Sequence, residues 1–153
     1  MIMILNDLLT KQNVFTKILL KDKEKELPKE LKIKVMRIRM AYTKAKKAFD
    51  AEVQEFTEEL ITDEYKELNG KTERTAEEEA RLTELTNAVN SDYQEFLIQK
   101  GREEVNSIED TLTMDEYSDI VEVNAGNDVE INGNKIPAAD FLEIVYDLFV
   151  KED

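Results

Sequence analysis

Acidic side chains are the groups in this sequence that could do acid–base chemistry or hold a metal ion. They occur in runs, at Glu58-Glu59, at Asp63-Glu64 and at Glu77-Glu78-Glu79. Paired carboxylates at such spacing could act as a general acid and base or ligate magnesium. The third run, however, falls in the first turn of an expected helix, where acids favour the helix dipole. The other two fall on a helix face, so we interpret all three as solvated surface.

The residues that usually complete an enzyme site are missing. The chain has no His and no Cys, which removes the commonest general base and all thiolate chemistry. It also lacks a Gly-rich phosphate loop, and none of its three Ser residues lies in a nucleophile-elbow pattern. We therefore predict that the protein is not an enzyme and uses no cofactor or metal.

The segment DVEINGNK, residues 128–135, is similar to the start of a calcium loop. It offers Asp128, Glu130 and Asn132 before Gly133. An EF-hand needs a carboxylate at position 12 of its loop, and that position here is Ala139. We interpret the segment as a strand that enters an ordinary Asn-Gly turn.

Positive charge is concentrated near the start of the chain. Residues 1–47 hold 13 Lys/Arg and 5 Asp/Glu, a net of +8, whereas residues 48–153 hold 8 and 30, a net of −22. A nucleic-acid site would need aromatic or polar readers on a basic face, and the total charge of −14 repels phosphate. We therefore expect this basic segment to contact acidic protein surfaces and not nucleic acid. The candidate residues are Lys32, Lys34, Arg37, Arg39, Lys44 and Lys47.

The basic segment carries two competing periodicities. Leu31, Ile33 and Val35 alternate with lysines as a strand would, but Met36 breaks the alternation. A heptad seam lasts longer and has no Gly or Pro within residues 29–68, which favours one helix of about 40 residues. The seam positions are Leu31, Val35, Ile38, Tyr42, Ala45 and Phe49.

A second helix is expected to fold back on the first. Thr75 and Glu78 form a capping box at its start, and Gly101 can end it. The short connection predicts an antiparallel hairpin. The return helix reaches back only to about residue 45, so the basic segment needs another acidic neighbour. That neighbour is either the tail, where residues 103–153 hold 15 acids and two Lys, or a separate subunit.

The two ends of the chain complete the predicted fold. Asn6 can cap a first helix that runs to about Lys21. Two further helices begin after Thr113 and after Pro137, and Thr113 and Glu116 form a capping box at the start of the earlier one. Asn124-Ala125-Gly126 closes that helix. The predicted fold is mainly α: a long antiparallel helical hairpin with an N-terminal helix (1–102) and a small acidic α+β subdomain (103–153). The last helix offers an apolar partner surface or, equally, a core face, through Phe141, Val145 and Phe149.

This order of elements resembles a group of small helical proteins encoded among the structural genes of tailed bacteriophages. The likeness covers about residues 5–122, through KELPKELKIKVMRIRMAYTKAKKAFDAEV, NAVNSDYQEFLIQKGREEV and LTMDEYSDIV. It implies a role in a virion or its assembly and carries no catalytic residues. The chain departs from the group by adding residues 129–153.

We therefore expect a non-enzymatic structural protein of a phage particle. Its partners would be other phage structural proteins or further copies of itself, first in the host cytoplasm and then in the virion. The apolar MIMIL start is too short to span a membrane, so no membrane association is expected. The alternative is an acidic inhibitor that mimics nucleic acid and occupies a host defence or DNA-binding protein, as the net −22 of residues 48–153 suggests.

Overall fold

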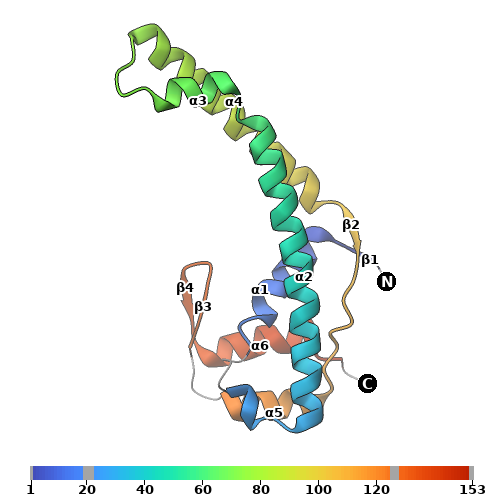
Figure 1. Ribbon diagram of the computed structural model, residues 1–153. Helices are drawn as coiled ribbons and strands as arrows, with labels where there is room; N and C mark the ends of the chain where they lie inside the picture. The colour runs from blue at the N-terminus through green and yellow to red at the C-terminus, as the bar shows by residue number, and fades with distance from the viewer. Residues whose placement is uncertain (1, 19–22, 125–127, 152–153) are drawn as a thin grey trace. The chain divides into compact units, whose positions relative to one another are not determined.

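The computed structural model describes residues 2–18, 23–124 and 128–151. It confirms a mainly α fold with a small α+β part (Figure 1). The chain forms two compact units. Unit 1 comprises Met1–Lys46 and Glu104–Asp153, and unit 2 comprises Lys47–Glu103. The predicted division after residue 102 puts the N-terminal helix and the tail in different domains. In the structure the N-terminal helix packs with the tail, and both belong to unit 1.

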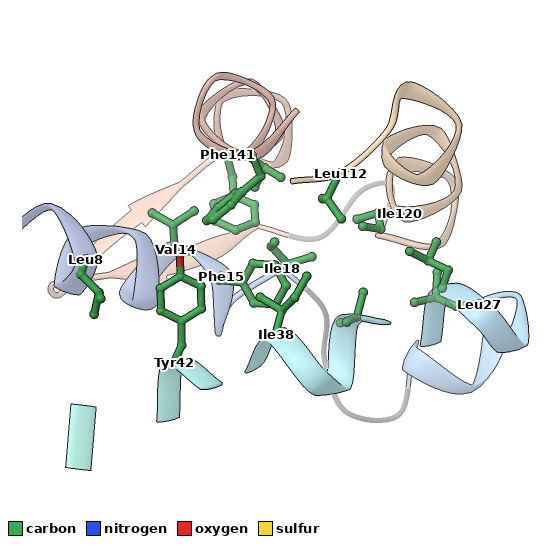
Figure 2. Packing of buried hydrophobic residues seen from close by; sticks show 14 residues of the cluster. Leu8, Val14, Phe15, Ile18, Leu27, Ile38, Tyr42, Leu112, Ile120 and Phe141 are labelled. Atoms are coloured by element: carbon green, nitrogen blue, oxygen red, sulfur yellow. The ribbon is translucent and has the colours of Figure 1, made fainter. Parts of the chain in front are cut away.

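Unit 1 surrounds the first part of helix α2 (Lys29–Leu60) with elements from both ends of the chain. Helix α1 (Leu5–Phe15) comes from the N-terminus, and the 3₁₀ turn η1 (Lys23–Glu26) leads into α2. Helices α5 (Met114–Asn124) and α6 (Ala138–Phe149) come from the tail. Their buried side chains form one core, which Figure 2 shows as a cluster converging from α1, α2, α5 and α6.

Short strands form antiparallel pairs in unit 1, and the first pair joins the N-terminus to the tail. Strand β1 (Ile2–Ile4) pairs antiparallel with β2 (Glu104–Asn106), with Met3 opposite Val105. Strands β3 (Val129–Ile131) and β4 (Asn134–Ile136) form a hairpin. Its turn has positive φ at Asn132 (52°) and Gly133 (79°), as a two-residue hairpin turn requires. The Asn-Gly turn and its preceding strand are therefore confirmed.

Unit 2 is a helical hairpin made from the end of α2, the short helix α3 (Asp63–Gly70) and α4 (Ala76–Gly101). Helix α4 has the predicted capping box, in which the Thr75 hydroxyl accepts from the Glu78 N–H at 3.1 Å. The helix also ends at Gly101, as predicted.

Two of the predicted helix limits are wrong, and two others lie outside the described residues. The basic segment is helical and not a strand, but the single helix over 29–68 is divided, because Thr62 caps a new helix by accepting from the Tyr65 N–H at 3.2 Å. Helix α1 begins at Leu5, directly after strand β1. Ile4 is at the N-cap position, so Asn6 lies inside the helix and does not cap it. Helix α1 ends at Phe15, and its predicted end at Lys21 lies outside the described residues, as does the closure at Ala125-Gly126.

Candidate partner-binding surface

Helix geometry divides the basic segment of α2 into an inner and an outer side. Each residue turns the helix by about 100°. The inner side carries Leu31, Val35, Ile38 and Tyr42, all at most 4% exposed. This is the predicted heptad seam, and it packs into the core of unit 1.

The opposite side of the same helix is apolar as well as basic. Ile33 is 54% exposed, Met36 45% and Met40 69%. Their spacing of three and four residues places them on one face, within about 60° of each other. Arg37 and Lys44 lie on the same face and are exposed. We call these five residues the outer face of α2: Ile33, Met36, Arg37, Met40 and Lys44.

The remaining predicted cations lie in different surroundings. The Lys34 ammonium donates to a Glu116 carboxylate oxygen of α5 at 2.7 Å. Thus Lys34 is neutralised by the tail of its own chain, one of the two alternatives that the sequence left open. Lys32 is half-buried and Lys47, in unit 2, is exposed. Arg39 is half-buried, and burial lowers the pKa of its guanidinium.

The predicted apolar surface of the last helix is part of the core. Phe141 and Val145 are 0% exposed and Phe149 is 2% exposed. The Phe149 ring packs edge-on against the Phe15 ring, with 5.2 Å between the ring centroids, because α6 packs on α1. These three side chains are therefore not available to a partner, and the prediction of a partner surface on this helix is corrected to the core alternative.

A buried polar group in unit 1 was not predicted from the sequence. Asp110 is 5% exposed, accepts a hydrogen bond from the Tyr42 hydroxyl and pairs with the Lys11 ammonium at 2.9 Å. Burial, together with the Asp110 carboxylate, raises the pKa of Tyr42. Tyr42 therefore stays protonated at neutral pH, and the group joins α1, α2 and the segment before α5. Its partners lie up to 99 residues apart, so no local pattern could reveal it.

An open cavity of about 580 Å³ lies beside this group. Lys11 and Asp110 line it, together with Ile108, Leu148 and Phe149. The two charges already satisfy each other, and the Lys11 ammonium also lies 5.3 Å from the centre of the Phe149 ring. We therefore attribute a structural role to these polar groups.

Across 2–18, 23–124 and 128–151, no group of three or more acidic residues is arranged to hold a metal ion. None of the helices described is both long and apolar enough to cross a membrane. Compared with known proteins, the chain matches no family, no curated protein and no solved structure.

The outer face of α2 is the feature that sequence reasoning missed. The sequence-based prediction assigned partner binding to the cations of the basic segment but not to the apolar side chains between them. A signal was present in the heptad: Ile33, Met36 and Met40 all fall outside the seam that faces the core. Large apolar residues at positions assigned to solvent indicate a surface that is covered by something else.

Proposed function

We propose that this protein is a non-enzymatic structural or assembly component of a bacteriophage particle, and that it binds other protein subunits. The observation that carries the proposal is the outer face of α2, where three large apolar side chains are exposed opposite the core. Helices with apolar anchors at such spacing commonly bind in a groove of a partner protein. Methionine adapts its shape to such a partner better than branched side chains do.

The charge of this face supports an acidic protein as partner. Arg37 and Lys44 lie beside the apolar anchors and would oppose carboxylates at the rim of a contact. Nucleic acid fits less well, because the apolar anchors would gain nothing from phosphates. The chain's total charge of −14 also opposes binding to a polyanion.

Mass spectrometry of purified virions from the phage that encodes the chain tests this proposal. The wild-type protein is expected in the particles at a constant copy number. The double variant Met36→Lys/Met40→Lys is expected to be lost from particles while still present in the infected cell. The matched control is Met114→Lys, since Met114 is also exposed (54%) but lies on α5. Absence of the wild-type chain from particles would refute the virion role.

A second candidate function rests on the acidic residues of unit 2. Lys47–Glu103 holds 7 Lys/Arg and 16 Asp/Glu, a net of −9. Such a surface supports an inhibitor that mimics nucleic acid. In that case immobilised protein would capture a basic nuclease or repressor from the host, and substitution of Met36 and Met40 would leave the capture unchanged.

A further inference from the structure

Unit 2 leaves its apolar side chains incompletely covered. Of its residues, all of which are described, only Leu68 and Gly101 are buried. The rings of Phe56 and Phe96 stack with their centroids 4.1 Å apart, yet both side chains remain partly exposed. We call the half-buried apolar positions of α2 and α4 the hairpin seam: Val53, Phe56, Leu60, Leu82, Leu85, Val89, Tyr93, Phe96 and Leu97.

Two contacts fix how the helices of the seam align. Phe56 stacks on Phe96. Glu52, one turn before Phe56, pairs with Lys100, one turn after Phe96. This antiparallel alignment brings Glu59 of α2 level with Asp92–Tyr93 of α4. Glu59 and Asp92 are both exposed. The seam therefore has carboxylates from both helices at its edge.

The hairpin seam and the outer face of α2 are complementary. The seam is apolar with acidic edges, in a unit of net charge −9. The outer face is apolar with Arg37 and Lys44 beside it. Each surface alone leaves apolar side chains in water, and bringing them together would remove that cost while pairing opposite charges.

We propose that the outer face of α2 in one copy docks on the hairpin seam of a second copy. The two surfaces differ, so the contact is heterologous and leaves an unused face and an unused seam at the two ends. Contacts of this kind close into rings or extend into filaments, as in many particle assemblies. The inference rests on the proposed function and narrows it, because it names another copy of this chain as the partner.

Charge reversal tests the contact in the full-length protein. In sedimentation velocity at low salt, the wild-type average mass is expected to rise with protein concentration. Arg37→Glu/Lys44→Glu reverses the face, and Glu59→Lys/Asp92→Lys reverses the seam edge. Each double variant is expected to weaken self-association at least about tenfold, because like charges then meet. All four residues are exposed, so circular dichroism should show an unchanged fold.

Mixing the variants gives the decisive result. Equal amounts of the two double variants should associate like wild type, because each reversed surface then meets its complement. The control Glu143→Lys/Asp147→Lys changes as much charge on exposed positions of α6 and should leave the association unchanged.

Three outcomes would overturn the inference. A wild-type chain that stays monomeric at all concentrations has no such contact. If Glu59→Lys/Asp92→Lys associates as wild type does, the seam is not the docking site. If the mixed variants stay apart, the two surfaces are not partners. None of these outcomes refutes the proposed function, because that proposal is tested by the presence of the chain in virions.

Discussion

The two units differ in how completely helices can cover one another. In unit 1, Phe15 is 0% exposed, because its ring packs against Tyr42 of α2 and Phe149 of α6 within one core. In unit 2, Phe96 stacks on a single ring and remains partly exposed. A helix with one neighbour can cover only one side of an apolar stripe, whereas several neighbours can enclose it. The difference predicts that a buried ring contributes more to stability in unit 1 than in unit 2, and that unit 2 gains from further contacts.

The largest expected effect comes from removing one aromatic ring from each unit. Phe15→Ala should lower the free energy of unfolding by about 3–5 kcal/mol, because it leaves a cavity in a closed core. Phe96→Ala should cost less than half as much, because water already reaches its ring. Denaturant unfolding followed by circular dichroism measures both. Equal costs would show that the seam of unit 2 is as closed as the core of unit 1.

Ionic contacts extend the comparison at a smaller scale. Asp110→Ala leaves the Lys11 ammonium and the Tyr42 hydroxyl without their carboxylate, and should cost about 2–3 kcal/mol. The counterpart in unit 2 is Glu64, which accepts from Arg81 at 2.7 Å on an exposed surface. Glu64→Ala should cost far less, because solvent screens exposed pairs.

Tyr42 provides the control for the buried group. Tyr42→Phe combined with Asp110→Ala should cost less than the two single changes added together, since the variants share one hydrogen bond. Additive costs would show that the bond contributes nothing. A loss for Glu64→Ala equal to that for Asp110→Ala would contradict the difference between the units.

Local signals in the sequence predicted the parts of this fold that depend on neighbouring residues. The capping boxes at Thr75 and Thr113 and the turn at Asn132-Gly133 form as predicted, since all their atoms lie within a few residues. The break at Thr62 was missed because the apolar pattern continues to Leu68 without Gly or Pro, while a threonine cap is a weak signal inside such a pattern.

Contacts between distant residues could not be predicted in this way. Met3 pairs with Val105 although the whole helical hairpin lies between them in the sequence, so no local pattern predicts the pair. The apolar face of α6 posed a different problem: Phe141, Val145 and Phe149 predict a buried stripe equally well for a core and for a partner. Only the packing of α1 on this face decides for the core.

Removal of a helix cap should lower the free energy of unfolding by nearly the same amount in both units, because a cap acts locally. In unit 1 the Thr113 hydroxyl accepts from the Glu116 N–H at 3.2 Å, and in unit 2 Thr75 accepts from the Glu78 N–H at 3.1 Å. Thr113→Ala and Thr75→Ala should each cost about 1 kcal/mol. Amide hydrogen exchange in the first turns of α5 and α4 measures the loss. A large cost at Thr113 alone would show that the cap is coupled to the core of unit 1.

The smallest expected effect concerns the ion pair between Lys34 and Glu116. Burial alone would raise the pKa of Glu116, but hydrogen bonds from Lys34 and from the Thr113 backbone outweigh it, so the pKa lies below the usual 4.5. A lowered folded-state pKa stabilises the fold above the unfolded value, and this contribution is lost as the pH falls through the folded-state pKa. Lys34→Gln should therefore cost below about 1 kcal/mol at neutral pH.

The pH dependence of this cost separates the ion pair from simple packing. The difference in unfolding free energy between wild type and Lys34→Gln should shrink as the pH falls from 6 through the folded-state pKa of Glu116, because the protonated acid no longer attracts the ammonium. A difference that stays constant with pH would assign the effect to the aliphatic stem of Lys34. Lys44→Gln is the matched control, since Lys44 lies on the outer face of the same helix, and its cost should be near zero in the monomer at every pH. If Lys34→Gln and Lys44→Gln behaved alike, Glu116 of the tail would not neutralise Lys34.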